Sequence, residues 1–286
     1  MALFPPNATP LERQSLYAAH CQTLTSSLTA PGARDHHLLT SLSSKTSFTV
    51  PSPLDGHPIP VIRYTHLPSS PTTTPTLKTI ILYLHGGGLH VGTATTEELS
   101  ILHMLTASSP SLEQAIEIYS PSYRLLPHHP AVTALSDCAA VLSHLLTTQP
   151  PSTNTKLILA GSSSGGQLAA LLSQLPDIAP RLAGVLLRGP VTSDAFSGVS
   201  TYVPAQFHKW HTSALEPSFR NSLLGVMNRA MPRDGLARMP LEAGGEVLRG
   251  LPRTWMQMCT NDALYSDGVC YAIALEEAGV EVRGGV

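Results

Sequence analysis

The stretch LILAGSSSGGQLAALL, at residues 157–172, changes from one periodicity to another across a turn of glycines and serines. The continuous apolar run at 157–160 is typical of a buried strand, and the residues after the turn have the apolar spacing of a helix. Between them, residues 161–165 (GSSSG) match the pattern G-x-S-x-G. A loose surface turn has the same composition. When a strand and a helix flank the pattern, however, it predicts a sharp turn that exposes the hydroxyl of Ser163.

A serine at this turn has what a nucleophile requires. Side chains two residues before and after Ser163 would clash across so tight a turn, which explains Gly161 and Gly165. The helix that follows directs its free N–H groups and the positive end of its dipole toward the serine. We therefore expect Ser163 to attack a carbonyl carbon and the backbone N–H of Ser164 to stabilise the oxyanion that forms.

A second motif, LHGGGLHVG at 84–92, also ends an apolar run. Three glycines in succession let the backbone approach a substrate carbonyl and present N–H groups to it. We predict Gly87 and Gly88 as further oxyanion donors, with Gly86 completing the loop and His85 shaping it. A glycine turn at a strand end would explain one motif, but two such motifs in this order favour an enzyme.

The rest of the chain predicts one α/β domain over residues 1–286. Apolar runs without alternation are separated by helical patterns, which indicates parallel strands covered on both faces. The predicted strands of this kind lie at 79–84, 115–120, 155–161, 182–189, 253–260 and 280–282, and the helices at 94–108, 130–146, 165–175 and 267–279. Two short strands at 47–53 and 59–67, a helical region at 10–44 broken at Pro31-Gly32, and an exposed, mobile Pro/Thr-rich loop at 68–76 precede or interrupt them.

Composition excludes several classes of function. The formal net charge is −2 and no basic stripe is present, so nucleic acids and anionic membrane surfaces are poor partners. Four cysteines lack metal-site spacing and are expected to be free thiols. No targeting segment and no apolar run near the roughly 18 residues of a membrane span were found, so we expect a cytoplasmic protein. No motif calls for a cofactor or a metal.

Longer segments resemble the α/β-hydrolases of the hormone-sensitive-lipase-like group, the α/β-hydrolase fold-3 family. YRLLPHHPAVTALSD at 123–137 and NDALYSDGVCYAIALEEAGVEV at 261–282 are similar to two of its characteristic segments. The resemblance implies an α/β-hydrolase fold with a mostly parallel central sheet, Ser163 as nucleophile and Asp262 as the acid of a catalytic triad. It also implies that residues 1–45 and 194–250 form a helical cap over the acyl pocket.

Asp262 is also a candidate by its position, because it follows a predicted strand at the carboxyl end of the sheet. Its role would be to orient a histidine and to stabilise the imidazolium. The alternative for Asp262 is a turn or helix-capping aspartate, although Asp267 fits the capping role better. Relative to the family pattern, Ser162 replaces an acid, Ser164 an alanine and Gln167 an asparagine.

The sequence has no histidine at the position expected for the base of the catalytic triad. The resemblance places the histidine after the acid, yet none of the 13 histidines follows Asp262. We therefore expect a shortened or mispredicted gene product with an incomplete C-terminal strand and helix, which would leave an apolar face exposed. We assign none of the earlier histidines as the base, namely His90, His128, His129, His208 and His211.

The sequence thus predicts a hydrolase of small-molecule carboxylic esters that works through an acyl-enzyme on Ser163 and is impaired if the histidine is absent. The alternative is a non-catalytic protein that binds small molecules on the same fold. Amide, thioester, lactone and carbamate substrates are not separated from esters by these motifs.

Overall fold

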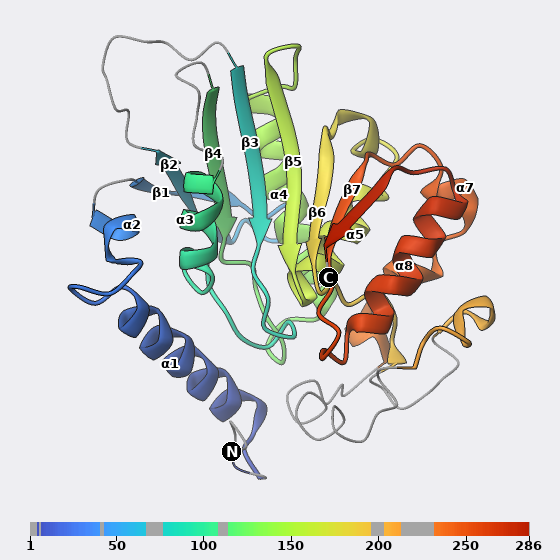
Figure 1. Ribbon diagram of the computed structural model, residues 1–286, viewed down its shortest axis with the longest axis horizontal. Coiled ribbons are helices and arrows are strands. Elements are labelled where there is room, and N and C mark those ends of the chain that lie inside the picture. The colour runs from blue at the N-terminus through green and yellow to red at the C-terminus, as the bar shows by residue number, and fades with distance from the viewer. Residues whose placement is uncertain are drawn as a thin grey trace.

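The computed structural model describes residue 5 and residues 7–40, 43–66, 77–107, 114–195, 203–212 and 232–285. Its centre is an eight-stranded sheet in the order β1-β2-β4-β3-β5-β6-β7-β8 (Figure 1). The strands are β1 (Ser43–Pro51), β2 (Pro58–His66), β3 (Leu77–Leu84), β4 (Gln114–Pro121), β5 (Thr155–Ser162), β6 (Gly184–Arg188), β7 (Thr254–Gln257) and β8 (Val282–Gly285). The pairs β1–β2 and β2–β4 are antiparallel and the other pairs are parallel, which confirms the predicted sheet.

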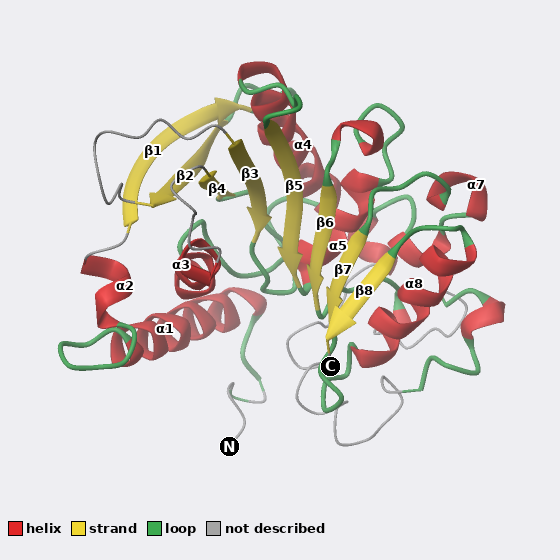
Figure 2. Ribbon diagram, turned by 45° about the horizontal axis from the view of Figure 1, so that its top comes forward, coloured by secondary structure: helices red, strands yellow, loops and turns green. Residues whose placement is uncertain are grey.

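Helices lie on both faces of the sheet (Figures 1 and 2). The α-helices are α1 (Pro10–Leu28), α2 (His36–Thr40), α3 (Glu98–Ala107), α4 (Ala131–Thr148), α5 (Ser164–Ser173), α7 (Gly245–Leu248) and α8 (Tyr265–Glu277). Short 3₁₀ turns lie at η1 (Ala179–Arg181), η4 (Ala205–Phe207), η6 (Pro232–Gly235) and η7 (Pro240–Glu242). Helices α4, α5 and α8 share one apolar core with one face of the sheet, and α2 and α3 pack on the other face.

The central strands are buried on both faces, as their unbroken apolar runs predict. In β3, Ile80 and Leu82 belong to the core under α4 and α5, whereas Ile81 and Tyr83 belong to the core under α3. Each of these four side chains is at most 7% exposed. Alternate residues of a strand point to opposite faces, so this strand holds the two layers of helices together.

Coverage of the second face is uneven in the part of the chain that the structure describes. Helix α3 packs over β2 and β4, but no described helix lies over the same face of β5 to β8 (Figure 1). Ile158 and Leu186 are therefore only half-buried there, and Trp255 is 40% exposed. These residues line a shallow cavity of about 290 Å³. The prediction of helices on both faces holds.

The N-terminal helical region divides as predicted, since α1 and α2 are separated by a turn in which Gly32 has φ +84°. Helix α1 lies beyond the carboxyl ends of the parallel strands, on the side expected for a cap (Figures 1 and 2). The predicted loop at 68–76 lies outside the described residues, as do 196–202 and 213–231 of the second predicted cap segment.

The expectation that no segment has the length and composition of a membrane span does not hold. Among the described residues, helix α4, with 18 residues, is long and apolar enough to cross a membrane. Half of that window is buried, because the helix packs on the sheet through residues such as Val141, Leu142 and Leu145. A core helix passes the same test of length and composition.

Candidate active site

Ser163 stands at a strained turn between the last residue of β5 and the first residue of α5. Its backbone has φ 52° and ψ −119°, a conformation that non-glycine residues rarely adopt. The Ser163 N–H donates to the carbonyl oxygen of Arg188 at 2.8 Å, and the Ser163 carbonyl accepts from the N–H of Val191 at 3.2 Å. The end of β6 and the segment just after it therefore hold the strained residue on both sides.

The glycines around this turn are required by contacts between backbone segments. A Cβ atom on Gly161 would lie 2.2 Å from the carbonyl oxygen of Gly165, and one on Gly165 would lie 2.1 Å from the carbonyl oxygen of Leu84. Real Cβ atoms do not approach backbone oxygens this closely. The clash predicted from the sequence is therefore present, and it involves β3 as well as the turn itself.

The glycine loop after β3 lies against Ser163. A Cβ atom on Gly86 would be 3.3 Å from the Cβ of Ser163. Gly87 and Gly88 have φ angles of +125° and +63°, which turn their amides away from the path of the strand. Within the part of the chain that the structure describes, the N–H groups of Gly87, Gly88 and Ser164 have no hydrogen-bond acceptor. These amides are available to an acceptor that enters the site.

His85 supports the loop from inside the protein. Its ring stacks on Tyr123 with centroids 4.2 Å apart, and its Nδ1 lies 2.8 Å from the carbonyl oxygen of Gly86. The Tyr123 hydroxyl donates to the backbone oxygen of His85 at 2.5 Å. Burial lowers the pKa of His85 to about 4, so the ring is neutral near pH 7. The side chain thus shapes the loop, as predicted, and does not carry charge.

Ser164 makes a side-chain contact that sequence reasoning missed. Its Oγ accepts a hydrogen bond from the N–H of Leu89 at 3.1 Å, and the side chain is buried. This bond ties the start of α5 to the end of the glycine loop. Its only signal in the sequence was a hydroxyl where the family pattern has an alanine.

Ser163 and the glycine loop open into one cavity of about 390 Å³. Its described lining consists of Gly86, Gly87, Gly88, Val91, Glu97, Ser162, Ser163, Arg188, Gly189, Gln257, Cys259, Asp262 and Leu264. The structure thus brings Ser163, the glycine loop and Asp262 together. The charged groups Glu97 and Arg188 also reach the cavity and were not predicted, because no local pattern marks them.

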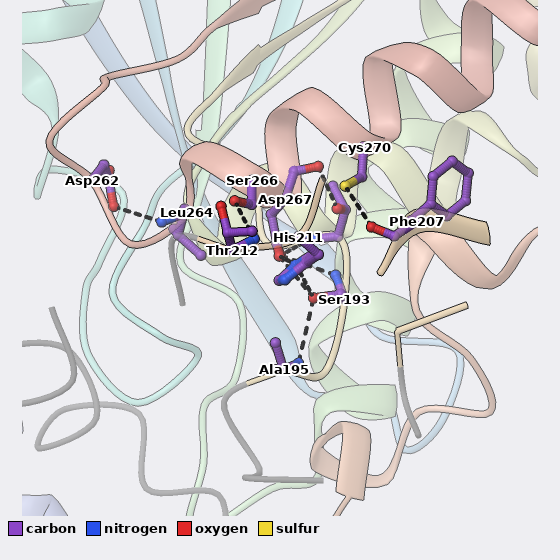
Figure 3. Close-up of polar contacts among 11 residues, drawn as sticks. Ser193, Ala195, Phe207, His211, Thr212, Asp262, Leu264, Ser266, Asp267 and Cys270 are labelled. Carbon is purple, nitrogen blue, oxygen red and sulfur yellow. Dashed lines mark hydrogen bonds and ion pairs between the residues drawn. The ribbon is translucent and has the colours of Figure 1, made fainter. Parts of the chain in front are cut away.

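Asp262 lies in the turn between β7 and α8. Its Oδ1 accepts from the N–H of Leu264 at 2.9 Å, which fixes the carboxylate (Figure 3). Its Oδ2 is on the side of Gly189, where an added Cβ would lie 3.5 Å away. The carboxylate is half-buried and faces the cavity that contains Ser163.

No histidine is present among the described residues that line this cavity. The Nδ1 of His90 lies 2.9 Å from the carbonyl oxygen of Gly88, in the glycine loop. The Nε2 of His208 lies 2.8 Å from the carbonyl oxygen of Val203. His128 and His129 are in the connection between β4 and α4. None of these reaches the position of a base for Ser163.

The prediction that Asp267 caps α8 is wrong. Helix α8 begins two residues earlier, and the fully buried Asp267 carboxylate binds the segments after β6 and η4 instead (Figure 3). Its Oδ2 accepts from the N–H groups of Thr192 and Ser193 at 2.7 and 3.0 Å. Its Oδ1 accepts from Ser193 Oγ at 2.7 Å and lies 2.5 Å from His211 Nε2. A buried carboxylate needs such donors, and helix capping alone would not supply them.

His211 is therefore a structural residue. Burial alone would lower the pKa of His211, but the hydrogen bond and the charge of Asp267 outweigh burial and raise the pKa. The adjacent N–H of Thr212 donates to Ser266 Oγ at 3.0 Å. Together these contacts fasten residues 203–212 to the start of α8, close to the turn that carries Asp262.

The fold agrees with what a comparison with known protein families finds. A family model described as the alpha/beta hydrolase fold matches residues 81–284. This chain is a member of the α/β-hydrolase fold family. The assignment made from the two glycine-containing motifs and the longer similar segments is therefore confirmed.

Named relatives of this α/β-hydrolase include esterases. Carboxylesterase NlhH of Mycobacterium tuberculosis is 29% identical over 211 residues, which cover 71% of this chain and 62% of that protein. Ethyl acetate hydrolase of Pseudomonas putida is 29% identical over 238 residues, covering 80% and 69% of the two chains. The chain thus spans less than two thirds of the length of the mycobacterial relative.

Solved structures share the fold. The crystal structure of vibralactone cyclase has a TM-score of 0.75 at 22% identity, covering 99% of this chain and 82% of that chain. An esterase of Pyrobaculum calidifontis has a TM-score of 0.73 at 20% identity, covering 99% and 84%. At such low identity the likeness shows the architecture of this α/β-hydrolase.

The turn glycines give a test of stability. Gly165→Ala places a methyl group against two backbone oxygens that cannot move without distorting β3, so we expect a loss of about 3 kcal/mol or more in the free energy of unfolding. Gly245→Ala is the matched control, because nothing lies within 4 Å of its added methyl group. Thermal unfolding of both variants checks this, and equal melting temperatures would contradict it.

The His211–Asp267 pair gives a test of pH dependence. Because the folded-state pKa of His211 is raised, its stabilising contribution is fully present below the unfolded pKa of about 6.5 and is lost as the pH rises through the folded pKa. His211→Gln should cost about 3 kcal/mol at pH 6 and less at pH 9. Unfolding curves at several pH values measure this, with the exposed His20→Gln as control. A pH-independent difference would refute the role given to the charge.

Proposed function

We propose that this chain hydrolyses carboxylic esters of small molecules through an acyl-enzyme on Ser163. The observation that carries the proposal is that a hydroxyl on a strained turn meets, at one cavity, backbone amides that have no acceptor among the described residues. Arrangements of this kind stabilise the oxyanion of acyl transfer. The names of the relatives, a carboxylesterase and an ethyl acetate hydrolase, support the same reaction class.

In the proposed reaction, Ser163 Oγ attacks the ester carbonyl carbon and passes its proton to a general base, a part that no histidine of the described cavity lining supplies. The carbonyl oxygen becomes an oxyanion that accepts hydrogen bonds from the amides of Gly87, Gly88 and Ser164. The alcohol leaves with a proton and the acyl group stays on Ser163. Water then attacks this second ester and releases the acid. Asp262 is the acid that orients the base and stabilises its charged form.

The cavity and its surroundings suit small substrates. Its volume of about 390 Å³ matches that of sites for small molecules. We also propose that the chain forms one domain in which the parts of residues 1–45 and 194–250 that lie outside the sheet and its packed helices, α1 among them, cover the site. The position of α1 beyond the carboxyl ends of the strands supports this arrangement (Figure 2).

A second candidate is a non-catalytic protein that binds small molecules on the same fold. The absence of histidine from the described lining of the cavity favours it. The two candidates differ in whether Ser163 reacts.

A fluorophosphonate probe separates them. The probe should label the wild type at Ser163, because the amides also stabilise the phosphonyl adduct. Ser163→Ala should abolish labelling, whereas Ser162→Ala should retain it, and peptide mass spectrometry identifies the modified residue. An unlabelled but folded wild type would support the binding protein and overturn the hydrolase.

Asp262 provides an independent test. Asp262→Asn keeps the shape of the side chain and removes its charge, so we expect kcat/KM for 4-nitrophenyl butyrate to fall about 100-fold or more. Asp177→Asn, at an exposed turn, is the control and should match the wild type. If Asp262→Asn retained wild-type kcat/KM, the triad role of Asp262 would be excluded.

A further inference from the structure

Arg188 is a charged residue whose backbone is hydrogen-bonded to that of Ser163. It ends β6, its partner in the parallel register with β5 is Ser162, and its carbonyl oxygen accepts the Ser163 N–H at 2.8 Å. Its side chain lines the same cavity as Ser163, Gly87 and Asp262. Among the described residues of that lining, it is the one with a positive charge.

Two contacts orient the guanidinium group. Its Nη1 donates to the hydroxyl of Tyr83 at 3.1 Å, and its Nε donates to Oε1 of Gln257 at 3.2 Å. These partners come from β3 and β7, the strands that flank β5 and β6. A planar group held at two points by rigid strands is preorganised to bind a ligand.

The nearby carboxylate does not saturate this cation. Glu97 accepts the Tyr83 hydroxyl at 2.5 Å, so the phenol stands between the Glu97 carboxylate and the guanidinium. Burial lowers the pKa of Arg188, but the nearby Tyr83 and the negative charge of Glu97 outweigh burial and keep the pKa high. The remaining N–H groups of Arg188 have no acceptor in the part of the chain that the structure describes.

The N–H groups of Arg188 that have no acceptor among the described residues are suited to bind a carboxylate. A guanidinium binds carboxylates through paired, charge-assisted N–H bonds, and because Arg188 is half-buried such bonds are screened less than at the surface. A neutral alkyl chain gains nothing from these donors and leaves them unsatisfied. Arg188 and Ser163 line the same cavity, so a carboxylate bound to the guanidinium would share that cavity with an acyl group attached to Ser163.

We infer that Arg188 is a specificity-determining residue and that the preferred substrates are small esters that carry a carboxylate, such as monoesters of short dicarboxylic acids. This inference rests on the proposed ester hydrolysis and names its substrate class. The carboxylate belongs either to the acyl part or to the alcohol part of the ester, and the two arms of the experiment distinguish them.

The experiment compares pairs of esters in which one member carries a carboxylate and the other carries the methyl ester of that carboxylate. The acyl arm uses 4-nitrophenyl hydrogen adipate and its methyl ester, and the alcohol arm uses 4-acetoxybenzoate and its methyl ester. We expect kcat/KM of the wild type to favour the anionic member of one pair by about tenfold or more. Raising the salt concentration should reduce that preference, because screening weakens the attraction.

The variants assign the preference to Arg188. Arg188→Gln should bring the anionic-to-neutral ratio to about one, and Arg188→Lys should retain part of it. Arg249→Gln removes the same charge from an exposed residue outside the cavity lining and should leave the ratio unchanged. An unchanged ratio in folded Arg188→Gln, or a wild type that prefers neither anionic ester, overturns the inference while leaving the proposed hydrolysis intact.

A binding measurement keeps the two proposals separate. Calorimetry with monomethyl adipate and dimethyl adipate is carried out on Ser163→Ala, which cannot turn over an ester. Selective binding of the monoester that is lost in Ser163→Ala/Arg188→Gln supports the role of Arg188 even if the wild type hydrolyses nothing. Equal binding of the two esters contradicts that role. If Arg188→Gln fails to fold, Arg188→Lys and the salt dependence decide the question.

Discussion

The structure is organised around the strained backbone of Ser163. A non-glycine residue at φ 52° persists only where its surroundings hold it, and here β6 does so through the hydrogen bond from the Ser163 N–H to the Arg188 carbonyl. The same sharp turn brings Gly165 against the end of β3, where any side chain would collide with Leu84. The turn, the glycine loop and the end of β6 therefore form one packed unit, and the polar groups of the site lie around it.

Support for the glycine loop comes from a segment that has no direct part in the cavity. Tyr123 stacks on His85 and donates to its backbone oxygen. The next residue, Arg124, donates from Nε and Nη2 to both oxygens of the buried Asp137, at 2.9 and 2.8 Å, so the segment is anchored to α4. The similarity of residues 123–137 to the family pattern thus has a structural reason, since this segment holds the loop in place beneath the site.

Two aspartates close together in the sequence have different functions. Asp262 is half-buried in the turn before α8 and faces the cavity, whereas Asp267 is fully buried and accepts donors from two other segments (Figure 3). Through Ser193 and His211, Asp267 connects the chain after β6 with residues 203–212. These contacts fix the start of α8 and hence the turn that positions Asp262. An aspartate that binds buried backbone N–H groups is thus part of the scaffold of the site.

The sequence alone predicted the parallel strands, the two glycine motifs and the positions of Ser163 and Asp262, because unbroken apolar runs and tight turns are local properties of the chain. It did not predict Glu97 or Arg188 in the cavity, and it gave Asp267 the wrong role. Those outcomes depend on which polar side chains meet when β3, β6 and β7 become neighbours, and no periodicity along the chain encodes such a meeting. Tertiary packing decided them, since burial forces each charged group to find partners on whichever strand or helix lies next to it.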